Sequence, residues 1–415
     1  MKKKILSAVL IFIMVPFCTN YSFSSKSGKD QKNLKEISSS LFNSSSSLLN
    51  KYDLGRHHKN KFEAVDSIIN ASIADTAFPD AVLLVQKDGK ILHEKAYGYY
   101  TYDPSSGKVT VNTMYDLASL TKVIATTTAT MMCYDRGLFK LDDKVAKYLP
   151  KFGVNGKENV TIRNLLVHDS GMMPDIRSYK AYDSVANKEQ AVMNEIYNDS
   201  LVYPTGSKMV YSDLNFILMG KIIEKVTGMP LDKFCEKNIF KPLGMNSTMF
   251  NPPKSLIPRI APTEIDNYWR HRLIRGTVHD ETSQLLGGVA GHAGLFSTAG
   301  DLAKLLQMLL QKGVYHGKRY IKASTVEMFV KKQSDLSTRA LGWDTKSPHY
   351  SSAGKLFSDI SYGHTGFTGT SVWTDPTRKL IIIFLTNRVY PTRKDLKILR
   401  VRPEVQDAVV RAIEQ

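Results

Sequence analysis

Cysteine is scarce in this chain of 415 residues, which contains only Cys18, Cys133 and Cys235. Three cysteines allow at most one disulfide, so a disulfide-rich scaffold is excluded. Cys133 and Cys235 lie in segments with helical spacing, where we expect them to be small buried thiols. The fold must therefore depend on a hydrophobic core, and the chain is long enough to bury one.

Metal and cofactor motifs are also missing. The sequence has no HExxH motif and no paired Cys/His spacing, and its ten histidines are dispersed. It has no phosphate-binding glycine loop, and it lacks the Gly-x-Ser-x-Gly elbow of α/β-hydrolases. We therefore expect neither a metal nor a cofactor.

Acidic residues are outnumbered. The chain has 56 Lys and Arg against 39 Asp and Glu, which gives a formal net charge of +17. The basic residues are scattered, and no RNA- or DNA-binding signature accompanies them. We interpret the charge as a cationic surface in an anionic cell envelope, and we expect no nucleic-acid partner.

The apolar run near the N-terminus is too short to span a membrane stably. MKKKILSAVLIFIMVPFC is typical of a secretory signal, so we predict a signal peptide over residues 1–22 and export to the periplasm or cell envelope. A flexible Ser/Lys-rich spacer is predicted over 23–60. Cys18 would permit a lipid anchor in the membrane, but Val15-Pro16-Phe17 matches a lipobox poorly, and ordinary cleavage is the alternative.

One catalytic domain is predicted over residues 61–415. AVLLVQKDGKILHEKAYGYY has the pattern of a β-hairpin with its turn at Asp88-Gly89. A largely helical middle follows, strands return in YGHTGFTGTSVWTDP and KLIIIFLTN, and RPEVQDAVVRAIEQ closes the chain as a helix. Strands at both ends indicate an α+β fold with one sheet assembled from both chain ends and flanked by helices.

Ser119-Leu120-Thr121-Lys122 begins a predicted helix with an apolar body. Residues three apart share a helix face, so a hydroxyl nucleophile would lie beside an amine that can take its proton. The positive end of the helix dipole disfavours a charged lysine and favours an oxyanion. Taken alone, a capping serine with a solvated lysine is the stronger interpretation. Ser352 and Lys355 have the same spacing, but they fall in a Gly/Ser loop that would not align them.

Two further elements follow in order. Tyr211, in Tyr211-Ser212-Asp213, precedes a helix, where a phenol either packs in the core or shuttles a proton beside an ammonium. His364 enters a strand and either orients a substrate group or has no role. Gly366, two residues later, permits close backbone approach of a substrate.

Ser119, Lys122, Tyr211 and His364 in this order resemble the penicillin-recognising serine hydrolases. The resemblance covers about residues 62–413 and is to the branch with class C β-lactamases, penicillin-binding D-amino-acid peptidases and esterases. It extends to NLLVHDSGM, YPTGSKMVYSDLNF, KPLGMNST and GHAGLFSTAGDLAKL. RGTVHDETSQLLGGVAGHAGLF is similar to exported N-acetylmuramyl-L-alanine amidases and cell-wall peptidases. The implied fold is the β-lactamase/transpeptidase fold.

The resemblance also implies roles for individual residues. Ser119 would be the nucleophile, Lys122 its general base, and Tyr211 the group that passes the proton to the leaving group. His364 stands where many relatives have lysine. The backbone N–H groups of Ser119 and Phe367 would form the oxyanion hole.

Two departures from the β-lactamase pattern bear on the substrate. His364 is mostly neutral at pH 7, whereas β-lactamases place a cation opposite the antibiotic's carboxylate. Asp213 stands where they usually have asparagine, and a carboxylate there would repel an anionic β-lactam. Asp213 could hold Lys122 protonated or receive a substrate cation, so whether Lys122 or Tyr211 is the base stays open. His279 and His292 lie in the glycine-rich segment RGTVHDETSQLLGGVAGHAGLF. Both can be structural histidines of a tight loop, and the alternative is that His292 binds substrate.

The predicted function is hydrolysis of amide bonds in peptidoglycan fragments, either as a muropeptide amidase or as a D-alanyl carboxypeptidase. A carboxylesterase is the first alternative. The second is an inactive cell-wall-binding or sensor protein on the same fold, against which the presence of serine, lysine and tyrosine together argues.

Overall fold

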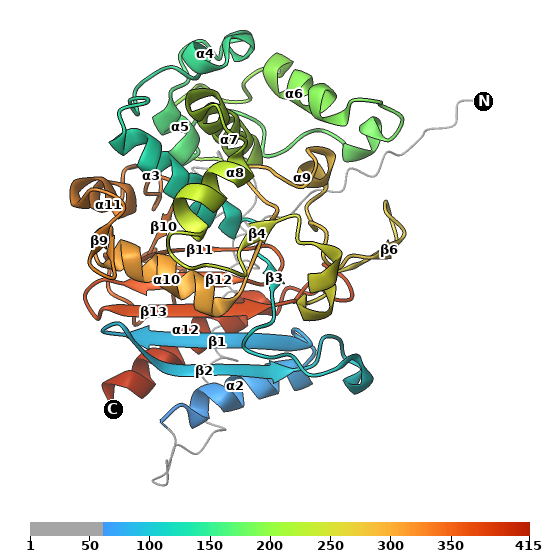
Figure 1. The fold of residues 1–415 in the computed structure, drawn as a ribbon, viewed down its shortest axis with the longest axis vertical. Coiled ribbons are helices and arrows are strands. Elements are labelled where there is room, and N and C mark those ends of the chain that lie inside the picture. Colours follow the sequence, from blue (N-terminus) through green and yellow to red (C-terminus); the bar gives the residue numbers. More distant parts are fainter. Residues whose placement is uncertain (1–60) are drawn as a thin grey trace, which may run out of the picture. The chain divides into compact units, whose positions relative to one another are not determined.

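The computed structural model describes residues 61–415 (Figure 1). The predicted signal peptide over 1–22, the spacer over 23–60 and Cys18 lie outside the described residues. Within the described part of the chain, no helix is both long and apolar enough to cross a membrane.

A six-stranded antiparallel sheet has the order β10-β11-β12-β13-β1-β2. Its strands are β1 (Asp80–Lys87), β2 (Lys90–Gly98), β10 (Asp344–Thr345), β11 (Tyr362–Thr365), β12 (Ser371–Asp375) and β13 (Leu380–Thr386). The first strand pairs with the last, from Ala81 opposite Thr386 to Lys87 opposite Leu380. The prediction of one sheet assembled from both chain ends is therefore confirmed.

The predicted hairpin at Asp88-Gly89 is also confirmed. Both residues have positive φ, 51° and 77°, as a type I′ turn between two strands requires. The apolar run of β1 is buried on both faces, because alternate residues enter two different cores. Val82 and Leu84 face the helical region, whereas Leu83 and Val85 face the two terminal helices.

Helices cover both faces of the sheet (Figure 1). The terminal helices α2 (Glu63–Ala74) and α12 (Ile398–Glu414) share the smaller core with the sheet. On the other face lie α10 (Ala299–Leu310) and a helical region. That region contains α3 (Thr128–Asp135), α4 (Val145–Tyr148), α5 (Ile162–Val167), α6 (Lys188–Asn198), α7 (Asp213–Thr227), α8 (Leu231–Cys235), α9 (Glu281–Leu285) and α11 (Ala323–Val330).

Shorter elements connect these layers. Two π-helical segments are η2 (Lys122–Thr127) and η5 (Glu236–Phe240), and the 3-10 turns are η1 (Pro104–Ser106), η3 (Pro150–Phe152), η4 (Tyr179–Tyr182) and η6 (Lys254–Arg259). The short strands are β3 (Tyr115–Asp116), β4 (Met249–Phe250), β5 (Ile265–Asp266), β6 (Arg272–Leu273), β7 (Leu295–Ser297), β8 (Val314–Tyr315) and β9 (Lys318–Arg319). Cys133 and Cys235 are free and buried, as expected.

The segment YGHTGFTGTSVWTDP differs from its predicted single strand. It forms β11 and β12 with a turn over residues 366–370 between them. The Gly366 N–H donates to Thr370 O at 2.7 Å, and the Gly369 N–H donates to Gly366 O at 3.1 Å. The chain reverses here because these backbone bonds close the turn.

Candidate active site

Ser119 lies in a tight turn that leads from β3 into the helix ending with α3. Ala118 has a φ of +45°, and the Lys122 N–H donates to Ser119 O at 3.0 Å. The helix is wider than predicted over Lys122–Thr127, where it has π geometry. The Thr127 hydroxyl donates to Lys122 O at 2.7 Å and supports this wider turn. Such π segments are frequent at functional sites.

The Lys122 ammonium lies among three oxygen acceptors. Its Nζ is 3.0 Å from Ser119 Oγ, 3.1 Å from His292 O and 2.5 Å from Asp213 Oδ1. The side chain is fully buried, and its Nζ also lies 4.9 Å from the centre of the Tyr211 ring. The contacts with Ser119 and His292 are hydrogen bonds, and the contact with Asp213 is an ion pair.

Asp213 determines the charge of Lys122. Burial alone lowers the pKa of Lys122, but the Asp213 carboxylate and Tyr211 outweigh burial and raise this pKa to about 12. Lys122 is therefore protonated at neutral pH. The dipole at the start of the helix, which disfavours this charge, is outweighed by a carboxylate in direct contact.

Tyr211 and Asp213 flank Lys122 because the chain enters α7 at this point. The Asp213 N–H donates to Pro174 O at 2.7 Å, and the carboxylate lies at the α7 N-terminus, which favours a negative charge. The Tyr211 ring stacks on the His168 ring, with their centres 4.5 Å apart. His168 Nδ1 accepts the Ser212 N–H at 3.1 Å, so this histidine holds the Tyr211 backbone and ring.

His168 is a supporting residue that the sequence analysis did not identify. Its signal was present, because it lies in NLLVHDSGM, one of the segments that carry the family resemblance. Its φ of +60° ends α5 in a left-handed residue and turns its ring toward Tyr211.

His364 lies on β11, with its ring centre 6.1 Å from that of Tyr211. Its Nδ1 is 2.8 Å from Thr365 O, and because a carbonyl only accepts, Nδ1 carries the hydrogen. Nε2 is thus a buried acceptor that has no hydrogen-bond partner within residues 61–415. Burial, followed by the charges of Arg339 and Lys122, holds the pKa of His364 well below its usual value. The ring is neutral at pH 7.

The turn after β11 packs on the segment that precedes Ser119. The Thr368 hydroxyl donates to Asp116 O at 2.7 Å, and the Thr370 hydroxyl donates to Leu117 O at 3.1 Å. A Cβ on Gly366 would overlap Leu117 O and the Thr370 hydroxyl. The close approach that this glycine permits is therefore to the chain itself.

The backbone N–H groups of Ser119 and Phe367 make no hydrogen bond to any residue in the described part of the chain. Both lie at the junction between the turn after β11 and the segment that precedes Ser119. Two backbone donors without a partner among the described residues therefore lie at this junction.

The glycine-rich segment over 287–294 brings His292 to Lys122. A Cβ on Gly291 would overlap Phe216 O, so the segment packs directly on the α7 backbone. The His292 ring is buried, and its Nε2 lies 2.8 Å from Asp280 Oδ1. The contact of His292 with Lys122 is through its backbone carbonyl oxygen, which accepts from Lys122 Nζ.

Two more carboxyl groups lie close by. Burial and the carboxylates of Asp213 and Asp280 raise the pKa of Asp175 to about 8. Burial also raises the pKa of Asp280, but the charge of His292 outweighs it and leaves this pKa well below its usual range. Burial lowers the pKa of His292, and Asp280 outweighs that effect and raises it.

His279 supports the other side of the site. Its N–H donates to Asp116 Oδ2 at 2.7 Å, and its Nε2 lies 2.9 Å from Glu264 Oε2. The ring stacks on that of Phe367, with centres 5.7 Å apart. His279 is thus one of the side chains that hold the turn after β11.

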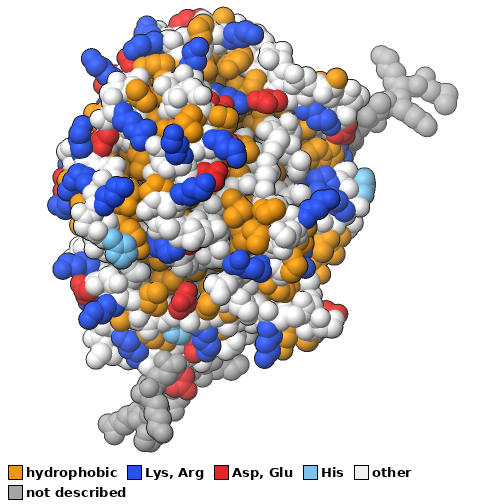
Figure 2. Space-filling model, viewed as in Figure 1, with side chains coloured by type: hydrophobic (Ala, Val, Ile, Leu, Met, Phe, Trp, Pro, Cys, Tyr) orange, Lys and Arg blue, Asp and Glu red, His pale blue; other side chains and the backbone are white. Residues whose placement is uncertain are grey.

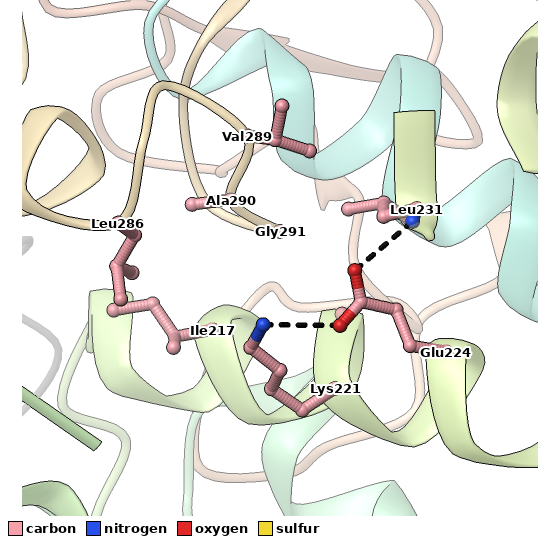
Figure 3. A pocket seen from close by; sticks show the side chains of 9 residues that line it. Ile217, Lys221, Glu224, Leu231, Leu286, Val289, Ala290 and Gly291 are labelled. Atoms are coloured by element: carbon pink, nitrogen blue, oxygen red, sulfur yellow. Dashed lines mark hydrogen bonds and ion pairs between the residues drawn. The ribbon is translucent and has the colours of Figure 1, made fainter. Parts of the chain in front are cut away.

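A small cavity lies behind the glycine-rich segment (Figure 3). Ile217, Leu286 and Gly291 line it, and the ion pair between Lys221 and Glu224, at 3.0 Å, lies beside it. Its volume of about 10 Å³ is at the lower limit for holding one water molecule and is too small for a substrate.

The described residues also bear on the expectations about a metal ion and about a nucleic-acid partner. No group of three or more His, Cys, Asp or Glu side chains within residues 61–415 could hold a metal ion. The face drawn in Figure 2 shows Lys and Arg side chains spread over the surface rather than gathered in one patch.

The sheet, the helical region and the contact between Ser119 and Lys122 define a serine hydrolase with a β-lactamase-like fold. The family model described as Beta-lactamase matches residues 65–406. The chain belongs to this family, so the predicted family, fold class and enzyme class are confirmed.

Two curated relatives are each 37% identical to the chain. One, from Escherichia coli K12, is named "Putative D-alanyl-D-alanine carboxypeptidase", and the match covers 76% of this chain and 79% of that protein. The other, from Bacillus subtilis 168, is named N-acetylmuramyl-L-alanine amidase, and the match covers 79% and 81%. A solved penicillin-binding protein homologue from Caulobacter crescentus has a TM-score of 0.68 at 19% identity over 87% of this chain and all of that one. That structure supports the fold alone.

Proposed function

We propose that the protein is an exported serine hydrolase that cleaves amide bonds in peptidoglycan fragments through an acyl-enzyme on Ser119. The observation that carries this proposal is the 3.0 Å contact between Ser119 Oγ and a fully buried Lys122. The carboxypeptidase and amidase names of the two relatives support the substrate class and a place in the cell envelope.

The proposed first step forms a bond from Ser119 Oγ to the substrate carbonyl carbon. The carbonyl oxygen takes the negative charge between the N–H groups of Ser119 and Phe367. Because Lys122 starts as an ammonium, it accepts the Ser119 proton only as it gives one of its own to Asp213. The net transfer is therefore from Ser119 to Asp213, and Lys122 keeps its charge.

The second step breaks the bond between the carbonyl carbon and the leaving nitrogen. Tyr211, beside Lys122, passes a proton to the leaving amine and is reprotonated from Lys122, which recovers a proton from Asp213. Water then attacks the acyl carbon, the bond from this carbon to Ser119 Oγ breaks, and the proton lost by the water returns through the Lys122–Asp213 pair to Ser119. His364 Nε2, the unpartnered buried acceptor, binds an N–H or O–H donor of the substrate or of the attacking water.

The same site disfavours β-lactams. The neutral His364 provides no cation for the antibiotic's carboxylate, and Asp213 adds a negative charge next to the nucleophile. Gly366 and His292 complete the site through their backbones, Gly366 in the turn and His292 at Lys122.

Incubation with purified muropeptides, followed by mass spectrometry of the products, tests the proposal. Release of a lactyl-sugar and a free peptide identifies an amidase, whereas loss of a terminal D-alanine identifies a carboxypeptidase. Ser119→Ala is the matched control and should give neither product. Cleavage of short-chain esters alone would instead identify a carboxylesterase, and a folded chain that no serine probe labels would be a binding protein.

A further inference from the structure

Arg402 is a buried arginine in α12 that forms no ion pair with a carboxylate of the described residues. Only 5% of the Arg402 surface is accessible to solvent. One nitrogen, Nη2, donates to Gly366 O at 2.7 Å and to Thr370 O at 3.0 Å, while Nε has no hydrogen-bond partner within residues 61–415. Burial, followed by the charge of Arg388, lowers the pKa of Arg402 to about 9, so the guanidinium is still charged at pH 7.

The turn after β11 does not need this charge to close. Gly366 O already accepts the Gly369 N–H, and Thr370 O already accepts the Gly366 N–H. A buried charge without a counter-charge is costly, and a neutral donor would satisfy the same two oxygens. Closing the turn is therefore not a sufficient reason for an arginine here.

The position of Gly366 O points to another role. Gly366 O and the Phe367 N–H are the two ends of one planar peptide group, in which electrons are delocalised from nitrogen to oxygen. A cation at the oxygen draws electron density from the nitrogen and makes the N–H a stronger donor, as hydrogen bonds in a chain polarise one another. The Phe367 N–H is one of the two donors proposed to bind the oxyanion.

We propose that Arg402 is a positioning residue that polarises the Gly366–Phe367 peptide group, so that its N–H stabilises the oxyanion formed on attack by Ser119. This inference rests on the proposed function of Ser119. It adds a charged group that acts on the oxyanion through one peptide, from the side of the sheet covered by the terminal helices.

Arg388 holds the following peptide of the same turn. Its Nε donates to Phe367 O at 2.7 Å, and its guanidinium carbon lies 4.3 Å from the Phe367 ring centre. Its Nη1 also donates to the carbonyls of Arg393 and Asp395. Arg388 thus anchors the turn to its surroundings, whereas Arg402 contacts the carbonyl of the peptide that donates.

A fluorophosphonate probe measures the effect directly. Ser119 Oγ forms a bond to phosphorus, fluoride leaves, and the Ser119 proton goes to the Lys122–Asp213 pair, while the phosphoryl oxygen occupies the oxyanion site. We compare labelling rates of wild type, Arg402→Gln, which keeps a donor, and Arg402→Lys, whose single nitrogen keeps the charge. We expect Arg402→Gln to react about tenfold more slowly and Arg402→Lys within threefold of wild type, since loss of a whole oxyanion donor costs about 10²–10³.

The controls distinguish the loss of the arginine that contacts Gly366 O from the loss of any other arginine on the same helix. Arg400→Gln removes an arginine from the same helix that lies near Glu404 and Asp75 instead, and it should label at the wild-type rate. With a minimal ester substrate, Arg402→Gln should lower kcat and leave KM within twofold, because the charge acts on the transition state. If Arg402→Gln does not fold, as judged by circular dichroism, a semisynthetic chain with the neutral isostere citrulline at position 402 replaces it.

The outcomes also separate the two proposals. A wild-type chain that labels at Ser119, together with equal rates for Arg402→Gln and Arg402→Lys, would overturn the role of Arg402 and leave the proposed function standing. A folded wild-type chain that does not label, or that labels equally well as Ser119→Ala, would overturn the proposed function and this inference with it.

Discussion

At the residue scale, the central group is an ammonium that cannot accept a proton until it gives one away. Lys122 makes short contacts with Ser119 and with Asp213 at the same time. The serine-x-x-lysine spacing predicted the first contact, because both residues lie in one helical turn. The presence of aspartate rather than asparagine at position 213 suggested the contact with Asp213. The 2.5 Å distance of this contact depends on how α7 approaches the helix that contains Lys122.

Asp213→Asn should change the pH dependence of the reaction. Without the carboxylate, burial dominates and the pKa of Lys122 falls below its value of about 12, yet Lys122 must now lose its own proton before it can act as a base. The acid limb of kcat/KM should therefore move to higher pH. We expect a loss of about 100-fold at pH 6 that narrows toward pH 9, measured as a pH–rate profile on an ester substrate.

A loss of the same size at every pH would contradict this role for Asp213 and favour binding of a substrate cation. An acid limb of kcat/KM that falls at the same pH in wild type and in Asp213→Asn would contradict it as well. The groups that surround the pair are Asp175, Asp280, His292 and Tyr211, and they are unchanged in the comparison.

Asp175 should make stability depend on pH. Its folded pKa of about 8 lies above its ordinary value of about 4, so its neutral form is favoured by folding. Its contribution to the free energy of unfolding is therefore fully present below about pH 4 and is lost as pH rises to about 8. Asp175→Asn removes this loss, so its Tm should exceed that of wild type by a larger margin at pH 8 than at pH 5. A constant difference in thermal melts would contradict the assignment.

At the element scale, the site depends on where a turn and two segments meet. The hairpin over β1 and β2 was predictable from its local turn residues, Asp88 and Gly89. The turn between β11 and β12 was not, because its conformation depends on contacts with Asp116 and Leu117, about 250 residues earlier. His168 and Arg402 were missed for a similar reason, since each contacts a residue that is distant in sequence.

Gly366→Ala should separate the turn from the segment before Ser119. The new Cβ would overlap Leu117 O and the Thr370 hydroxyl, so the turn must shift away. Displacement of a catalytic donor by about 1 Å can cost about 100-fold in rate, and we expect a loss of at least about tenfold in kcat/KM. The matched control is Gly300→Ala in α10, where the nearest atom to the Cβ is 3.8 Å away, and it should keep full activity. Equal activity of the two variants would contradict the proposed placement of Phe367.

At the scale of the whole molecule, the sheet joins two cores. Trp343 is buried in the core on the side of the helical region, and Trp373 is buried in the core beneath the terminal helices. The strands β1 and β13 send alternate side chains into both. The composition predicted a core but not its division, because the division follows from which residues face each side of the paired strands.

The two cores should unfold together. Chains that keep only Trp343 or only Trp373, with the other tryptophans replaced by phenylalanine, report on the two sides separately. In urea titrations, the fluorescence midpoint of each variant should coincide with the midpoint that far-UV circular dichroism gives for the same variant. A fluorescence midpoint that differs from the circular-dichroism midpoint of the same variant would show that the layers on either side of the sheet unfold independently.

The pairing of β1 with β13 also bears on when the proposed site is completed during synthesis. The β1–β2 hairpin leaves the ribosome early, but its partner strand β13 and the helix that carries Arg402 come last. Ser119 is therefore made long before the turn that holds Phe367 and the helix behind it. A nascent chain would therefore carry the proposed nucleophile in an incomplete site until the segment with β13 and α12 has joined the sheet.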